Sequence, residues 1–230
     1  MANEIINYLE MCQREGMMSL QKGMNFRVSK DHSVILMSIR LNSPYQDRVE
    51  DEGNTIIYEG HDVPKTAQNP FPKTVDQIGS LPSGKLNDNG KFNKVAQNCK
   101  ILGVPPERVR VYEKIMRGIW SYNGVFHLVD SWLEESQGRK VFKFKLVAVE
   151  GDEDFSQPVP LSPQFRRIIP TWVKVEVWKR DQGKCVICGT SRDLHFDHII
   201  PWSKGGSSTT PANVQLLCGK HNIQKHTNIE

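Results

Sequence analysis

Little in this sequence points to a membrane or to secretion. The 230 residues contain no run of about 18 apolar residues, the length that a bilayer-spanning helix needs. Met1–Gly23 has no apolar core of the kind found in signal peptides. Three of the five cysteines lie in one C-terminal pattern, which leaves Cys12 and Cys99 unassigned. This usage fits a reducing cytoplasm better than secretion, so we expect a cytoplasmic protein with no membrane partner.

Strong charge of one sign, internal repeats and low-complexity tracts are also missing. The net charge is +4, with 38% hydrophobic and 24% charged residues, as in an ordinary globular protein. The charge is uneven, because ten Lys/Arg and five Asp/Glu follow from Gln164 onward. A basic terminal module suits a polyanion such as DNA, although surface charge of this size also serves solubility alone.

Hydrophobic periodicity predicts a β-rich first part with few helices. Apolar spacing indicates an amphipathic helix within Asn3–Lys22, interrupted near Gly16. Pro64–Gly90 has the composition of a long loop, and Phe92–Leu102 favours a short helix. Strand-like segments are predicted at Val34–Ile39, Thr55–Tyr58, Arg108–Ile115, Gly124–Trp132 and Arg139–Val149.

A change of composition marks a domain boundary. Asp152–Pro163 holds three acids and three prolines with few large apolar residues. We therefore predict domains at residues 1–151 and 170–230, joined by a linker at 152–169. Beyond the linker, Thr171 can begin a helix that carries Trp172, Val175 and Trp178 toward the second domain.

Two short motifs in the last quarter of the chain have the spacing of a zinc site. Cys185 and Cys188 are separated by two residues, and so are Cys218 and His221, which lets one tight turn direct both ligands of a pair at one ion. Together they form a closed Cys3His set with no open position, so this Zn²⁺ is predicted to be structural. A module of about 60 residues has a small core, which a metal would supplement.

The residues between and just after these motifs, in this order, resemble the zinc-bound HNH nuclease family, a ββα-metal fold, over about residues 170–228. The resemblance implies His198 as general base and Asp197 as metal ligand at the end of the first strand. Asn213 would brace the following loop and orient the base. The family's last position follows the final zinc ligand, which makes Asn222 a second ligand of one Mg²⁺ or Mn²⁺ ion.

Other polar residues of this module are candidate DNA contacts. His195 lies two residues before Asp197 on the same strand face, where it touches metal or phosphate or supports the site. His226 lies one helical turn beyond Asn222. For the lysines, the alternative is a solvated surface charge. The candidates are His195, Lys204, Lys220, Lys225 and His226.

Five blocks in the first part occur in a characteristic order: Thr55–Asp62, Asp76-Gln77, Asn93–Ala96, Arg108–Tyr112 and Tyr122–Trp132. Together they resemble SRA (YDG) domains over roughly Phe26–Val149, with Asn123 in place of the usual Asp. The resemblance implies a twisted SRA/PUA-like barrel with flanking helices. It also implies a reader that flips a cytosine out of the duplex and recognises a 5-methyl or 5-hydroxymethyl group.

The same match implies a base pocket. Tyr58 would stack on the extruded base, and Asp62 would accept a hydrogen bond from the cytosine amino group. The alternative interpretation makes Tyr58 a core aromatic residue and Asp62 a turn residue. Gln68 and Gln77 in the long loop are candidates to fill the position that the base leaves.

These expectations combine into one hypothesis: an α+β, modification-dependent restriction endonuclease of the type IV or IIM kind in a bacterial cytoplasm. Its partner would be double-stranded DNA with modified cytosine. One HNH site cuts one strand, so double-strand cleavage implies a homodimer. Two alternatives stay open: an HNH nicking or homing nuclease that reads unmodified sequence, and a non-cleaving protein that binds modified DNA.

Overall fold

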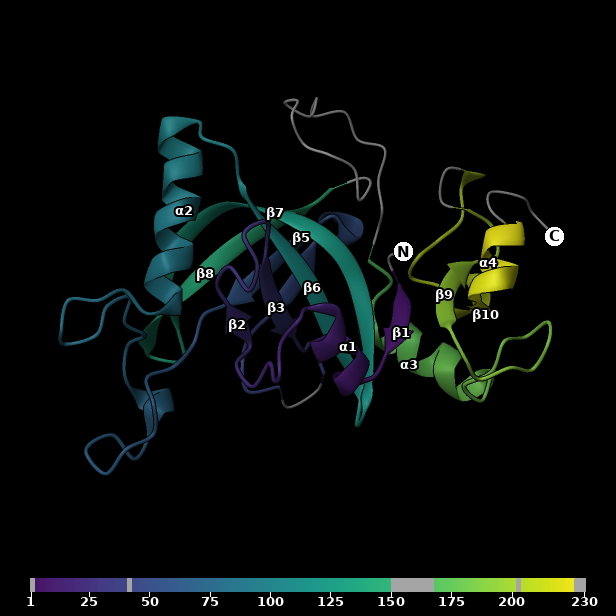
Figure 1. Ribbon diagram of the computed structural model, residues 1–230, viewed down its shortest axis with the longest axis horizontal. Helices are drawn as coiled ribbons and strands as arrows, with labels where there is room; N and C mark the ends of the chain where they lie inside the picture. The colour runs from purple at the N-terminus through teal and green to yellow at the C-terminus, as the bar shows by residue number, and fades with distance from the viewer. Residues whose placement is uncertain (1–2, 41–42, 150–167, 202–203, 226–230) are drawn as a thin grey trace.

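The computed structural model describes residues 3–40, 43–149, 168–201 and 204–225, and the fold is α+β as predicted (Figure 1). The helices are α1 (Tyr8–Arg14), α2 (Asp88–Leu102), α3 (Thr171–Arg180) and α4 (Gly219–Lys225). The strands are β1 (Glu4–Ile6), β2 (Met24–Asn25), β3 (Ser33–Met37), β4 (Arg48–Glu50), β5 (Thr55–Glu59), β6 (Glu107–Met116), β7 (Ile119–Ser136), β8 (Arg139–Ala148), β9 (Leu194–His198) and β10 (Val214–Cys218). Within the described ranges, none of the helices is long and apolar enough to cross a bilayer.

All ten strands join one sheet. One path runs β10-β9-β1-β7-β6-β3-β2, and β8 extends from β7 to β5 and β4. The neighbours pair antiparallel except β3 and β6, which are parallel. The long strands β7 and β8 curve around a core that includes Phe92, Phe126 and Phe144, with α2 on one side and α1 near the other end (Figure 1). Register shifts in β7 accompany this curvature.

The predicted strands of the first part are confirmed within a few residues at their ends. The predicted loop is confirmed from Pro64 to Asn87, with a single 3-10 turn at Pro72–Thr74. Helix α2 begins at Asp88, earlier than predicted, because the Asn87 side chain accepts a hydrogen bond from the Gly90 N–H at 3.0 Å. It ends at Leu102, and the cap residue Gly103 has a φ of 65°, which suits glycine.

The predicted N-terminal helix is wrong at its start. Ile5 and Ile6 lie in strand β1 instead, and the helix occupies Tyr8–Arg14 only. Asn7 begins the helix through a capping box, in which its side chain accepts from the Glu10 N–H and the Glu10 carboxylate accepts from the Asn7 N–H, both at 3.0 Å. The cap at Asn7 separates the β-branched residues Ile5 and Ile6 from the helix.

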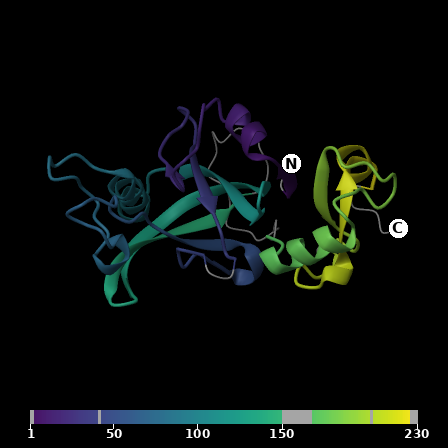
Figure 2. The same cartoon turned by 90° about the horizontal axis from the view of Figure 1, so that it is seen from below.

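Residues 168–225 form a small C-terminal module, in which β9, β10 and α4 make a ββα unit against α3 (Figure 2). The predicted face of α3 is only partly right. Trp178 packs on the module core, but Trp172 is exposed. Val173 and Val177 supply the buried contacts instead, because the helix is rotated to bury Lys174. The predicted linker lies outside the described residues up to residue 167.

Candidate active site

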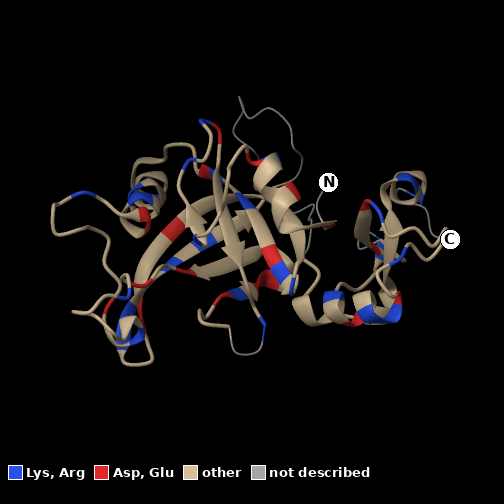
Figure 3. Cartoon of the chain, turned by 60° about the horizontal axis from the view of Figure 1, so that its bottom comes forward, with Lys and Arg blue, Asp and Glu red and all other residues tan. Residues whose placement is uncertain are grey.

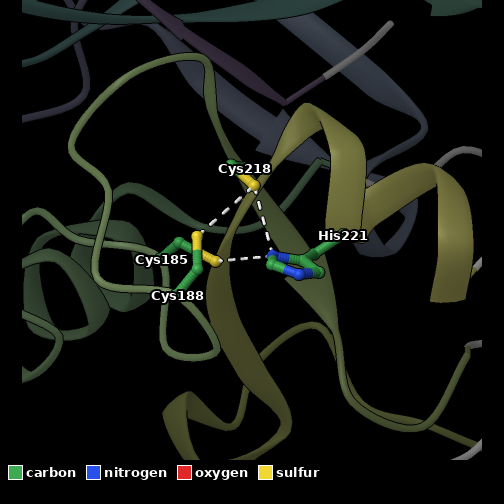
Figure 4. Close-up of side chains that lie close together, drawn as sticks. All are labelled: Cys185, Cys188, Cys218 and His221. Carbon is green, nitrogen blue, oxygen red and sulfur yellow. Dashed lines mark hydrogen bonds between the residues drawn. The ribbon is translucent and has the colours of Figure 1, made fainter.

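The two predicted zinc-binding pairs converge on one point. Cys185 and Cys188 lie in the turn after α3, Cys218 ends β10, and His221 is in the first turn of α4 (Figure 4). Their ligand atoms all lie within 4.8 Å of one another. Cys185 Sγ is 3.4 Å and Cys218 Sγ is 3.3 Å from Nδ1 of His221. This is a preformed four-ligand set.

The surroundings of Cys185 favour the thiolate that zinc needs. Burial opposes ionisation of this thiol, but the backbone N–H groups of Cys188 and Cys218 outweigh burial and lower its pKa to about 6. Three sulfur ligands and one imidazole nitrogen suit Zn²⁺ in tetrahedral geometry. The residues present therefore fit a closed structural zinc site.

His198 ends strand β9, where it pairs with Val214 of β10. Its Nε2 lies 2.9 Å from the hydroxyl oxygen of Ser208, which is buried. Burial lowers the pKa of His198, and the Lys225 ammonium acts in the same direction against the opposing charge of Asp197. A neutral imidazole at physiological pH has the free lone pair that a general base requires.

Asn213 holds the loop that follows His198. Its side-chain oxygen accepts a hydrogen bond from the Ile200 N–H at 2.9 Å. Its amide nitrogen donates to the carbonyl oxygens of Ile200 at 3.1 Å and Ser207 at 3.0 Å. Ser207 comes directly before Ser208, which contacts His198. Asn213 therefore holds the loop at Ile200, just after His198, and at Ser207, just before Ser208.

Asp197 is paired with a cation of the chain itself. Lys225 Nζ lies 2.8 Å from Asp197 Oδ2, and the same ammonium donates to the carbonyl oxygen of His198 at 2.6 Å. Only 1% of the Lys225 side chain is exposed. The expectation of a phosphate contact by Lys225 is therefore corrected: its buried ammonium is held between two site residues.

The other candidate DNA contacts of this module divide into buried and exposed groups. His195 is buried, with Nε2 3.2 Å from Asp193 Oδ1, so it supports the strand and does not face DNA. Lys204 and Lys220 are exposed and stay candidate phosphate contacts. Asn222 follows His221 on α4 and is half-buried. His226 lies outside the described residues.

Tyr58 does not face a pocket. It lies in β5 with 2% of its surface exposed, inside the core formed mainly by residues 3–40 and 43–149, which we call the large part. Burial raises its pKa well above the usual range. Its hydroxyl lies so close to Gly23 that a Cβ at that position would be 2.5 Å away. The predicted stacking role is corrected, because the ring is enclosed by packed protein.

Asp62 is also engaged internally. Its carboxylate accepts from Arg139 at 2.7 Å and pairs with Lys73 at 2.8 Å. Burial opposes its ionisation, but these two cations outweigh burial and lower the pKa of the carboxyl group. Its side chain is 9% exposed and is held by the chain's own cations, which does not fit the predicted contact with a cytosine amino group.

The two glutamines of the long loop have different surroundings. Gln77 is buried and donates to the carbonyl oxygen of Gly60 at 2.7 Å, while its own oxygen accepts from the Phe142 N–H at 2.9 Å. It ties the loop to β8 and is not available to DNA, so that expectation is corrected. Gln68 is exposed and stays a candidate.

Residues 185–228 match the family model described as HNH endonuclease. The matched segment contains the Cys3His set, His198 and Asn213, and we call residues 168–225 the HNH module from here on. The chain is also 25% identical over 203 residues to the histone-lysine N-methyltransferase family member SUVH2 of Arabidopsis thaliana. That alignment covers 80% of this chain and 30% of SUVH2.

Two solved structures are similar to larger parts of the chain. The SRA domain of SUVH5 in complex with hemimethylated CG DNA has a TM-score of 0.45 at 21% identity, covering 68% of this chain and 92% of that chain. The type IV phosphorothioation-dependent restriction endonuclease ScoMcrA has a TM-score of 0.44 at 16% identity, covering 99% of this chain and 57% of that chain. The HNH resemblance predicted from the sequence thus recurs in the family match over residues 185–228.

Ser208 and the structural role of Lys225 in the HNH module were not predicted from the sequence. Ser208 lies in a Ser/Thr-rich loop, where no spacing distinguishes it from its neighbours. Lys225 is one helical turn beyond His221, a spacing that places both residues on one side of α4. That spacing was the one available signal that Lys225 turns inward.

Proposed function

We propose that this protein is a DNA endonuclease that cuts near a modified cytosine. The observation that carries the nuclease half is the placement of His198 at the end of β9, within the segment that matches HNH endonucleases and beside a preformed Cys3His set. A structural metal in that set would hold α4 against the end of β10. The base and its loop would then have fixed positions.

The roles of the site residues follow from their chemistry. His198 accepts a proton from the attacking water, and Ser208 and Asn213 hold the imidazole and its loop in place. Asp197 and Asn222 offer hard oxygen ligands that suit one Mg²⁺ or Mn²⁺ ion. When bound, such an ion stabilises negative charge on the phosphate and on the leaving oxygen.

The recognition half of the proposal is supported by the five ordered sequence blocks that resemble SRA domains. Because Tyr58 and Asp62 are engaged internally, the base-contacting residues must be others. Tyr45 is the better aromatic candidate, since it is half-buried near Asp62. Lys73 Nζ lies 3.7 Å from the ring centroid and covers one face, so a base would stack on the other face. We propose 5-methylcytosine or 5-hydroxymethylcytosine, extruded from the duplex, as the recognised base.

We further propose a homodimer for cutting both strands and a bacterial cytoplasm as the location. The chain spans 30% of the length of SUVH2 and 57% of ScoMcrA, so these proposals concern the residues present here.

The test is cleavage of one DNA sequence prepared with cytosine, 5-methylcytosine, 5-hydroxymethylcytosine or a phosphorothioate backbone, with Mg²⁺ or Mn²⁺. The proposal expects cutting of the two modified-cytosine forms, lost in His198→Ala. Equal cutting of all four would favour an HNH nicking or homing nuclease that reads unmodified sequence. Binding biased to modified DNA without cutting would favour a non-cleaving reader, and cutting confined to the phosphorothioate form would contradict cytosine recognition.

A further inference from the structure

Strand β1 joins the HNH module to the large sheet. On one side it pairs with β7, with Glu4 opposite Tyr122 and Ile6 opposite Trp120, and on the other side Glu4 pairs with His195 of β9. The Asn3 N–H donates to the backbone carbonyl oxygen of Tyr122 at 2.7 Å, and the carbonyl oxygen of Asn3 accepts from the Phe196 N–H at 3.0 Å. One backbone ladder therefore runs from β7 to the strand that ends at His198 (Figure 1).

The side chains of this junction are divided between the two parts. Ile5 packs against the core of the HNH module, whereas its neighbour Ile6 belongs to a core cluster of the large part. The same division recurs just before α3, where Ile168 lies in the core of the large part and Ile169 in that of the HNH module. At two places in the chain, consecutive residues are thus anchored in opposite cores.

A buried ion pair lies at the same junction. Lys174 of α3 donates to Glu113 of β6 at 2.7 Å and to the Asn123 side-chain oxygen of β7 at 2.8 Å, and neither charged side chain has any exposed surface. Thr171 donates to the other oxygen of Glu113. Figure 3 shows both basic and acidic residues on α3, and those other than Lys174 lie in its second half. A buried ion pair of this kind fixes the position of α3 relative to β6 more than it stabilises the fold, because its partners tolerate little displacement.

We propose that the large part and the HNH module act as one rigid unit, so that the distance from the recognised base to the cut phosphate is set by this junction. The inference rests on the proposed function and specifies where the cut falls. Among the described residues, three kinds of contact join the two parts: the pairing of β1, the two isoleucine pairs and the Lys174–Glu113 pair. Together they oppose rotation of one part against the other. The cut should therefore fall at one offset from the modified cytosine on each strand.

The experiment maps cut positions at single-nucleotide resolution on a duplex with one 5-methylcytosine. The full chain should place most cuts at one position per strand. Ile5→Ser and Lys174→Met, which loosen the junction on its two sides, should reduce the share of that position by about twofold or more and spread cuts over its neighbours.

Matched controls separate the junction from general damage. Leu9→Ser removes an apolar side chain that is 70% exposed, and Lys179→Met makes the Lys174→Met change at an exposed position of the same helix. Both should keep the wild-type offset. If all junction variants failed to cut, thermal unfolding with a zinc-sensitive dye would decide, because a rigid unit releases zinc in the same transition that unfolds the large part.

The outcomes distinguish this inference from the function on which it rests. Cuts scattered around the methylated site in the unaltered protein, an unchanged offset in both junction variants, or zinc release in a separate transition would each overturn the rigid junction. Cutting that ignores the methylated site altogether would overturn the proposed function instead.

Discussion

Lys225 Nζ lies 2.8 Å from Asp197 Oδ2, so the chain's own ammonium occupies one oxygen of the carboxylate that is expected to hold the catalytic ion. The same nitrogen holds the carbonyl oxygen of His198. An arriving cation must share Asp197 with a buried positive charge. Lys225 therefore orders the end of β9, and we expect it to weaken binding of the proposed ion.

Replacing Lys225 with methionine should strengthen metal binding. The repulsion between a unit charge and a divalent ion about 4 Å apart is about 2 kcal/mol in a water-like medium, or about 30-fold in affinity. We expect the Mn²⁺ concentration that half-saturates the protein, measured by electron paramagnetic resonance, to fall by about that factor. Lys220→Met, on the exposed side of α4, is the matched control. Unchanged or weaker Mn²⁺ binding in Lys225→Met would show that the ammonium does not compete.

Ser208 should act on catalysis through His198. Removing its hydroxyl frees the imidazole to rotate, because Nε2 loses its contact at 2.9 Å. Losing an orienting partner of this kind typically costs about 10-fold to 100-fold. We expect Ser208→Ala to lower kcat by that amount with little change in KM for DNA, while Ser207→Ala stays close to the unaltered protein. A kcat within twofold of the unaltered value would argue against this role.

The Cys3His set should hold one zinc per chain. Serine is a poor zinc ligand, so Cys185→Ser should lose most of the metal and lower the melting temperature of the protein. Plasma mass spectrometry of the purified protein measures the zinc content. Cys99→Ser, whose thiol lies outside the set, should retain it. Full zinc in the Cys185 variant would contradict the ligand assignment.

Asp47 should make stability depend on pH. Burial raises the pKa of its carboxyl group to about 7, well above its usual value of 3.8. Between these values the folded protein retains a proton that the unfolded chain has lost, so the free energy of unfolding falls as pH rises and levels off above about pH 7. From about pH 5 to pH 8 the ionisation of Asp47 alone lowers the free energy of unfolding by about 3 kcal/mol.

The Asp47→Asn variant isolates that effect. Urea unfolding at about pH 5 and pH 8 should show a smaller difference in the variant than in the unaltered protein. Asp31→Asn, at an exposed position, should leave the difference unchanged. Equal pH dependence in all three proteins would contradict a protonated Asp47.

Local patterns in the sequence predicted what depends on local geometry. The two-residue spacing within each zinc pair follows from turn geometry. The position of His198 at the end of a strand was implied by the resemblance to HNH nucleases. Strand β1 could not be predicted in this way, because Ile5 and Ile6 are strand residues by virtue of β7 and β9, more than 100 residues away. Hydropathy patterns also give no sign that Lys174 is buried, since its partner Glu113 is remote in sequence.

For the base pocket, the sequence motif was present but did not predict where its side chains point. The sequence block that contains Tyr58 and Asp62 resembles SRA domains, but a motif does not say where a side chain points. The carboxylate of Asp62 pairs with Arg139 of β8 and with Lys73 of the long loop. Core packing around Tyr58 encloses its ring. Both outcomes depend on tertiary contacts that no local pattern contains.

The most direct test of the account is a competition in one tube between equal amounts of two DNA fragments of the same sequence context, one with 5-methylcytosine and one with cytosine, distinguished by length. The account predicts that the unaltered protein with Mg²⁺ cuts the methylated fragment at least about tenfold faster, and that His198→Ala cuts neither. Equal rates for the two fragments would contradict recognition of the modified base, and undiminished cutting by His198→Ala would contradict the assignment of the active site.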